Sequence, residues 1–114
     1  MVTKLEMDAA LARLTEAFPQ TFVLEKHRPH RPLKVGIAAD IPARCPDLEL
    51  RLLSEILSSY ALRVMYLQSI VAGAARVDLD GKEAGKVTAR DAGYAAATLA
   101  RRPGLWRPRA ESGL

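Results

Sequence analysis

Few residues of this chain have the types and spacing that catalysis or metal binding requires. His27 and His30 could supply two metal-binding nitrogens, with Cys45 or Asp40 as a third ligand, but this spacing in a proline-rich loop matches no strong zinc motif. Nothing in the sequence places a histidine base beside Cys45, so a buried or idle thiol is the simpler interpretation. We therefore expect neither a metal site nor an enzyme.

Basic residues are concentrated in two short segments that contain proline. The chain has 17 Lys and Arg against 13 Asp and Glu, a formal net charge of +4. Residues 26–34 hold four cations and no acid, and residues 101–114 hold four arginines and one glutamate. Proline excludes helix interiors from both segments, so we expect loops or extended arms. The charge favours a polyanionic partner, although two solvated loops would also explain it.

The composition is that of one soluble globular domain. The 114 residues are 49% apolar and 26% charged, which suffices for a single core. The single cysteine excludes an internal disulfide. There is no run of 18 apolar residues to cross a membrane, and the acidic first residues do not resemble a signal peptide. We expect a cytoplasmic protein with no membrane partner.

Apolar residues recur at helical spacing in most of the first 71 positions. Residues 4–17 predict an amphipathic helix that Pro19 ends, and residues 35–41 predict a short helix. Asp47 is a plausible N-cap for a helix that reaches Tyr60 and could bend at Ser58-Ser59. Residues 61–71 are apolar nearly all round, which predicts a helix central in the core.

The pattern changes to alternation after residue 75, which predicts one β-hairpin over about 76–87. Asp80-Gly81 is the strongest short hairpin signal. A two-residue loop would place Asp78 opposite Glu83, and a shifted register or a bulge at Gly85 would relieve that repulsion.

A last helix and a tail complete the predicted organisation. Thr88 and Asp91 resemble a capping box at the start of a helix over about 89–101, whose inward residues would be Ala92, Ala95, Ala96 and Leu99. The predicted fold is α+β and mainly α-helical, with a single compact domain over residues 1–100. Residues 101–114 form a basic tail that contains proline and glycine.

Exposed aromatic rings beside cations would suit the stacking of nucleic-acid bases. Tyr60 and Tyr66 lie near Arg63 in the sequence, although each tyrosine could equally be a core residue whose hydroxyl reaches the surface. Arg76 opens the first predicted strand and could be a surface residue that forms an ion pair, and Lys34 could simply be solvated. The residues alone leave these alternatives open.

Four motifs together resemble the ProQ/FinO domain of bacterial RNA chaperones over about residues 8–100. They are FPQTF at 18–22, RPLKVGI at 31–37, YL at 66–67 and RVDLDG at 76–81. The resemblance implies a mainly helical fold with one β-hairpin and no cofactor. It also implies an RNA chaperone that binds intrinsic terminator hairpins with 3′ single-stranded tails, in small RNAs and mRNA 3′ ends. Such a protein acts in post-transcriptional regulation and RNA stabilisation, here as a monomer without a small-molecule substrate.

The resemblance also assigns an RNA site on a concave face with a pocket for the RNA 3′ end. By motif position it contains Arg31, Lys34, Tyr66 and Arg76, with Tyr60 at its border, and a 3′ nucleotide is expected to stack on a tyrosine face. The other cations expected there are Lys26, Arg28, Arg51 and Arg63.

The sequence departs from the family on the central helix. Ser54 and Ser58 stand on its exposed face, where relatives usually carry basic residues, and Met65 precedes Tyr66 where relatives often have a cation. We therefore expect affinity either to depend on residues 26–34 and the tail at 101–109, or to be weaker overall. The rival function is a non-specific DNA-binding or protein-interaction module that uses the same basic face.

Overall fold

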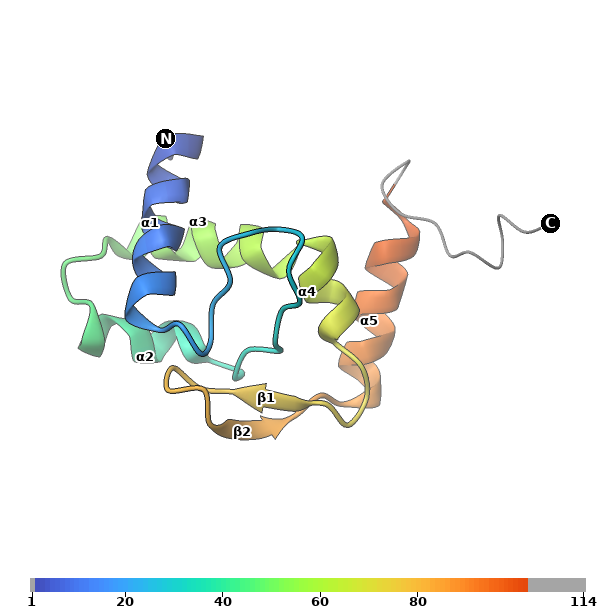
Figure 1. Cartoon of the computed structure of the whole chain (residues 1–114). Coiled ribbons are helices and arrows are strands. Elements are labelled where there is room, and N and C mark those ends of the chain that lie inside the picture. The colour runs from blue at the N-terminus through green and yellow to red at the C-terminus, as the bar shows by residue number, and fades with distance from the viewer. Residues whose placement is uncertain (1, 103–114) are drawn as a thin grey trace.

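The structure is a computed structural model that describes residues 2–102. Its helices are α1 (Lys4–Ala17), α2 (Ile37–Arg44), α3 (Leu50–Ala61), α4 (Val64–Ser69) and α5 (Ala89–Ala100), and its strands are β1 (Ala75–Val77) and β2 (Glu83–Lys86). Figure 1 shows α1 and α2 against one end of α3, α5 beside α4 at the other end, and the β-hairpin below. The predicted class, mainly α-helical α+β with one hairpin, is confirmed.

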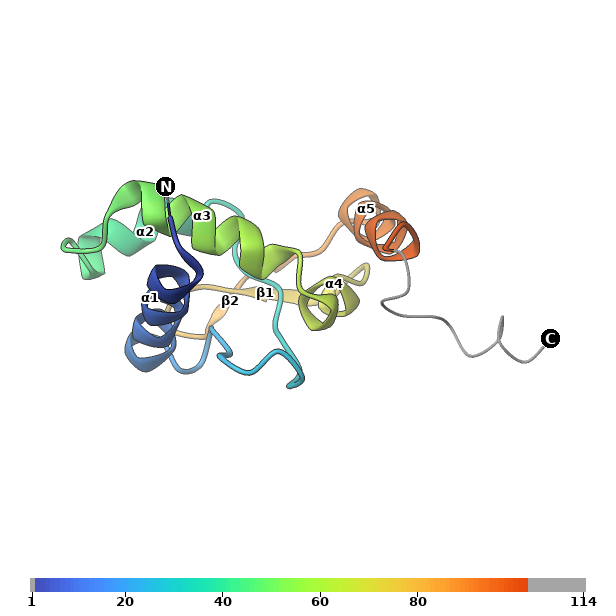
Figure 2. The same cartoon turned by 90° about the horizontal axis from the view of Figure 1, so that it is seen from above.

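Helix α1 forms as the sequence predicts. A capping box joins Thr3 and Glu6 at its start, and the residues it buries against α3 include Leu11 and Leu14. Phe18 and Phe22 follow and are both buried, which confirms that they anchor this turn to the core. Figure 2 shows α3 extending from above α1 to α4, so α3 links the two ends of the molecule.

Helix α3 starts later than predicted because Asp47 is committed elsewhere. Both guanidinium nitrogens of Arg13 bond to the Asp47 carboxylate, one at 2.6 Å between Nη2 and Oδ1. The N-cap of α3 is Glu49, whose side chain makes no capping bond. The expected bend at Ser58-Ser59 is absent too, since α3 continues to Ala61.

The single helix predicted over 61–71 is shorter than expected. The chain turns at Arg63, which has an extended backbone and is the N-cap of α4. Tyr66 and Leu67 are buried, so the predicted central position of this segment is confirmed. Helix α2 likewise starts two residues late, because Gly36 adopts a left-handed conformation with φ of 82°, and Pro42 lies inside that helix.

The β-hairpin has a longer turn than the two-residue loop that Asp80-Gly81 suggested. Val77 pairs with Glu83 and Ala75 with Lys86, so one extra residue lies in β2, where Gly85 has φ of 103°. The bulge therefore forms, and Asp78 does not face Glu83. The Asp78 carboxylate instead accepts the N–H groups of Asp80 and Lys82, which hold the pKa of Asp78 below its usual value.

Helix α5 is close to its predicted bounds, but its cap is only half a capping box. Thr88 accepts the N–H of Asp91, whereas the Asp91 carboxylate binds Arg76. Ala95 and Leu99 face the core as expected, while Ala96 is exposed. No helix within residues 2–102 is long and apolar enough to cross a membrane. The predicted tail lies outside the described residues from position 103 onward.

Candidate nucleic-acid interface

The motif residues 31–34 lie along the β-hairpin as a short additional strand. Leu33 forms a parallel bridge with Val77, the N–H of Lys34 donates to the Val77 carbonyl over 2.8 Å, and the Val77 N–H donates to Pro32 over 2.9 Å. A single bridging pair holds the segment only weakly, so its position against β1 needs further contacts. Those contacts come from side chains of α4 and β1.

Tyr66 and Arg76 form hydrogen bonds with the two backbone polar groups of Leu33, its N–H and its carbonyl. The Leu33 N–H donates to the Tyr66 hydroxyl over 3.1 Å. Arg76 donates to the Leu33 carbonyl over 2.7 Å and to Asp91 over 3.0 Å. Arg76 thus forms an ion pair, as one interpretation of the sequence allowed, but it is only 9% exposed and is not a surface residue. Its guanidinium joins β1, segment 31–34 and the first turn of α5.

Arg31 and Lys34 belong to the same segment and differ in their partners. Arg31 bonds to neutral carbonyls, whereas Lys34 forms an ion pair. Arg31 is exposed and donates to the carbonyls of Gln20 over 2.7 Å and Gly81 over 3.3 Å. These acceptors fix the guanidinium without cancelling its charge. Lys34 instead pairs with Asp40 at 2.7 Å. We call Arg31, Lys34, Tyr66 and Arg76 the β-hairpin group.

Tyr60 lies in the core beside Tyr66. It is 1% exposed and its ring packs against Phe22 and Tyr66. Its hydroxyl accepts the Val23 N–H over 2.9 Å, and burial raises the pKa of Tyr60. Tyr66 is 7% exposed. Both rings are therefore core residues, which is one of the alternatives that the sequence left open, and the stacking of a nucleotide on a tyrosine face stays a prediction.

Arg63 and His30 form a polar contact beside Tyr60 that the sequence did not indicate. Arg63 donates to the Val23 carbonyl over 3.0 Å and to His30 Nε2 over 3.2 Å, and lies 5.2 Å from the Tyr60 ring centre. His30 Nδ1 lies 2.7 Å from the Arg28 carbonyl, so the proton belongs on Nδ1 and the ring is neutral. Burial lowers the pKa of His30. These bonds give His30 a structural role.

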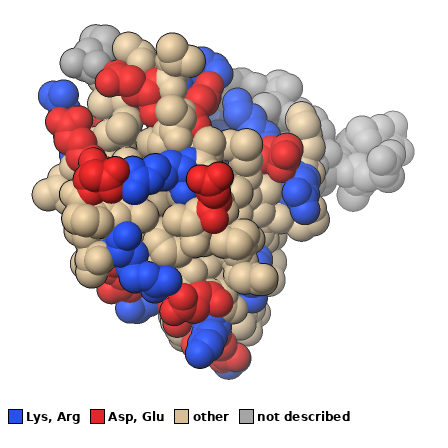
Figure 3. Space-filling view, turned by 60° about the vertical axis from the view of Figure 1, so that its left-hand side comes forward, with Lys and Arg blue, Asp and Glu red and all other residues tan. Residues whose placement is uncertain are grey.

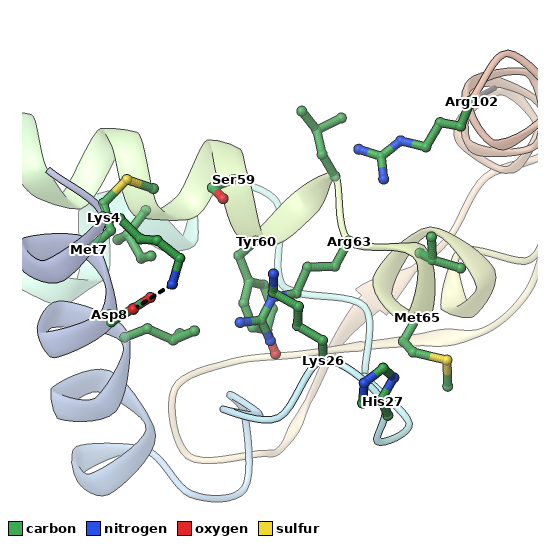
Figure 4. A pocket seen from close by; sticks show the side chains of 14 residues that line it. Lys4, Met7, Asp8, Lys26, His27, Ser59, Tyr60, Arg63, Met65 and Arg102 are labelled. Carbon is green, nitrogen blue, oxygen red and sulfur yellow. Dashed lines mark hydrogen bonds and ion pairs between the residues drawn. The ribbon is translucent and has the colours of Figure 1, made fainter. Parts of the chain in front are cut away.

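A pocket of about 670 Å³ opens above this contact, between α1, α3, α4 and the loop over residues 22–32. Figure 4 shows Lys4 and Asp8 on α1, Lys26 and His27 on the loop, and Arg102 after α5 around it. We call it the α1–α4 pocket. Of the predicted site residues, Lys26, Tyr60 and Arg63 line it, whereas the β-hairpin group does not.

The remaining predicted cations are exposed and lie apart from one another. Arg28 pairs with Glu25 at 3.4 Å. Arg51 is exposed in the first turn of α3, and Ser54 and Ser58 are exposed beyond it. In Figure 3 the Lys and Arg side chains are separated by Asp and Glu. Arg44 with Asp80 and Arg13 with Asp47 are examples of this pairing. The side of the domain in that view offers no continuous basic surface among the described residues.

The architecture defines a class of small α+β domain, in which a basic motif is built onto a β-hairpin and enclosed by helices. The model of the ProQ/FINO family matches residues 5–111, and the chain belongs to this family. The chain is 36% identical over 100 residues to the RNA chaperone ProQ of Shewanella pealeana and 38% identical over 97 residues to that of Shewanella amazonensis. Each match covers 82% of this chain and 45% or 43% of the relative, so the chain spans less than half the length of these relatives.

Solved structures agree with the fold. A ProQ homolog from Legionella pneumophila superimposes with a TM-score of 0.75 at 30% identity, covering 94% of this chain and 91% of that one. A FinO-like RNA chaperone from Neisseria meningitidis gives 0.67 at 21% identity, over 90% and 83% of the two chains. At that identity the second likeness concerns the fold alone.

Proposed function

We propose that this domain is an RNA chaperone that binds structured RNA, with intrinsic terminator hairpins and their 3′ single-stranded tails as its ligands. The observation that carries the proposal is the family match over residues 5–111, together with relatives named as RNA chaperones. The RNAs would be small regulatory RNAs and mRNA 3′ ends, and the role would be post-transcriptional regulation and RNA stabilisation. The domain would act in the cytoplasm as a monomer, without a cofactor and without catalysis.

Arg31 is the principal phosphate contact in this proposal. An A-form stem is recognised mainly by its shape and its backbone, which requires cations fixed on rigid elements. Arg31 is exposed and is held by two carbonyls from different turns, so its position is defined while its charge stays available. Lys34 is closely adjacent but shares its charge with Asp40, and Arg28 shares its charge with Glu25. Both contribute weaker attraction.

Arg76 and Tyr66 serve as positioning residues for that contact. Both bond to the backbone of Leu33 and neither exposes more than a small fraction of its surface. Their loss would release segment 31–34 from the β-hairpin and displace Arg31 and Lys34 together. The motif therefore combines two residues that present charge with two that hold it in place.

A filter-binding comparison at constant salt tests the function. The probes are one hairpin with a 3′ oligo-U tail, the same hairpin ending in a 3′ phosphate, a version whose tail continues into a second stem, and duplex DNA of equal length. We expect the tailed hairpin to bind at least tenfold more tightly than the DNA, and both blocked hairpins to bind more weakly. Equal affinity for DNA would support the non-specific DNA-binding alternative. Absence of micromolar binding to any probe would support the protein-interaction module.

A further inference from the structure

The α1–α4 pocket lies away from the RNA contacts proposed above. Its residues on α3 are Ile56, Ser59 and Tyr60, which lie on the opposite side of that helix from Ser54. None of the β-hairpin group lines it. Its volume of about 670 Å³ lies within the range of ordinary small-ligand sites. The described structure thus has a concave site apart from the β-hairpin group, and it contains Lys26, Tyr60 and Arg63 from the set expected at the RNA site.

The rim of the pocket carries uncompensated positive charge from three separate segments. Its acid is Asp8, which pairs with Lys4 at 2.9 Å. Arg63 bonds only to neutral acceptors, the Val23 carbonyl and His30. Within residues 2–102, neither Lys26 nor Arg102 takes part in an ion pair. Three positive charges therefore surround one hollow, which favours an anionic ligand.

The floor of the pocket is apolar and contains two thioethers. Met7 and Met65 lie on opposite flanks in Figure 4, and Leu62 and Val64 also contribute. Methionine sulfur makes favourable contacts with aromatic rings. The floor can thus accommodate a flat aromatic group. A nucleotide combines such a group with negative charge.

The placement of the cations distinguishes an internal nucleotide from a free one. Figure 4 shows Lys26 on the loop side of the pocket and Arg102 on the α5 side. A nucleotide within a strand carries a phosphate on each flank, so both cations are used at once. A free mononucleotide has one charged end and leaves the other cation unsatisfied.

We propose that the α1–α4 pocket is a second RNA site, which takes one unpaired nucleotide of a single strand, its base on the methionine floor and its flanking phosphates on Lys26 and Arg102. This inference rests on the proposed function, because it assigns a further part of the RNA ligand to this chain. The domain then holds a stem at the β-hairpin group and a single-stranded segment at the α1–α4 pocket.

The test uses methyl signals of the protein itself. Two of the three methionines, Met7 and Met65, line the pocket, so ¹³C-methyl-methionine NMR reports on it directly. The probes are an adenine hexamer RNA, an abasic hexamer of the same charge, AMP and an acidic peptide containing leucine. We expect the hexamer to shift both methyl signals saturably, AMP to shift them only at much higher concentration, and the abasic strand and the peptide to leave them in place.

A matched pair of charge reversals completes the experiment. Lys26→Glu with Arg102→Glu is expected to weaken hexamer binding at least tenfold. The control, Lys82→Glu with Lys86→Glu, makes the same change of charge on the exposed β-hairpin and is expected to weaken it less than threefold. Equal losses in the two double variants, equal shifts with the abasic strand, or shifts with the peptide alone would overturn the proposal.

Filter binding of the tailed hairpin separates this inference from the proposed function. A protein that binds the hairpin but whose methionine signals ignore the hexamer would retain the proposed function and lose the second site. A protein whose methionine signals respond to the hexamer but which does not distinguish the hairpin from duplex DNA would retain the pocket and lose the proposed function.

Discussion

The β-hairpin group and the α1–α4 pocket both contain basic residues, yet they use them differently. In the β-hairpin group, Arg76 is buried with two partners and Lys34 is paired with an acid. Around the pocket, Lys26 and Arg102 make no ion pair within residues 2–102. Among the described residues, Arg76 and Lys34 of the β-hairpin group thus have acidic partners inside the protein and Arg31 does not, whereas the pocket has unpaired cations from separate segments.

This difference shows that a basic residue in a motif can have its partners inside the protein. A buried arginine with neutral and acidic partners stabilises structure, and its removal leaves a buried carbonyl without a donor. An exposed arginine held by carbonyls keeps its charge for a ligand. Substitutions that change stability and affinity separately therefore test this difference between the two regions.

The largest effect is expected from Arg76→Met. This change leaves the Leu33 carbonyl unsatisfied and frees Asp91, so we expect a loss of about 2–3 kcal/mol in the free energy of unfolding, measured by urea denaturation. Lys86→Met is the control, because it removes an exposed pair with Glu83, for which about 0.5 kcal/mol is expected. Similar losses for both variants would show that Arg76 does not hold the fold.

Arg31→Met is expected to weaken binding of the tailed RNA hairpin about tenfold, a factor equivalent to about 1.4 kcal/mol. The logarithmic salt dependence should also flatten by a little under one unit, since one phosphate contact is lost. Lys82→Met, at the exposed turn, is the control and should change little. Arg31→Lys separates the charge from the two carbonyl bonds and should restore part of the affinity. If Arg31→Lys restored no affinity, the loss in Arg31→Met would come from a disturbed fold and not from the lost charge.

Lys34→Met is expected to have a smaller effect on affinity, less than threefold, because Asp40 already offsets its charge. Asp40→Asn should do the opposite and strengthen RNA binding, since Lys34 is then uncompensated. Filter binding of both variants at two salt concentrations checks this pair. A loss for Lys34→Met as large as that for Arg31→Met would contradict the distinction between paired and unpaired cations.

The smallest effect is a pH dependence from His30. Its pKa in the folded state lies below the usual 6.5 because burial disfavours the charged ring, so folding favours the neutral form. The contribution of neutral His30 to the free energy of unfolding is complete above about pH 6.5 and is lost as the pH falls toward the pKa of His30 in the folded state. Thermal unfolding between pH 7.5 and 5 should show a shallower decline in His30→Gln than in the parent. His27→Gln, at an exposed position, should leave the slope unchanged.

The local elements could be predicted from the sequence, since short-range patterns determine them. The spacing of Leu11 and Leu14, the proline after α1 and the Asp80-Gly81 turn each carry their own signal. Elements that depend on distant partners could not be predicted. The start of α3 depends on Arg13 binding Asp47, thirty-four positions away, and nothing near Asp47 indicates this.

In the candidate site, too, features set by short-range patterns could be predicted and features set by distant partners could not. The motifs that contain Arg31, Lys34, Tyr66 and Arg76 fold against each other, whereas the role of these residues in RNA binding stays a prediction. Burial could not be predicted, since Arg76 and the tyrosines are enclosed by side chains from several other elements. Lys26 and Arg63 were named, but their meeting with Lys4 and Arg102 around a pocket requires the tertiary fold.

The bond from Arg76 to Leu33 affects when the domain can fold during its synthesis. It spans 43 positions of sequence, and the partner bond of Arg76 reaches a further 15 positions to Asp91. Synthesis is vectorial and domains fold as units, so a nascent chain that has not yet exposed Asp91 lacks these contacts. Arg31 is then present but not positioned. The β-hairpin group therefore takes its final arrangement only once nearly all of the described chain has left the ribosome.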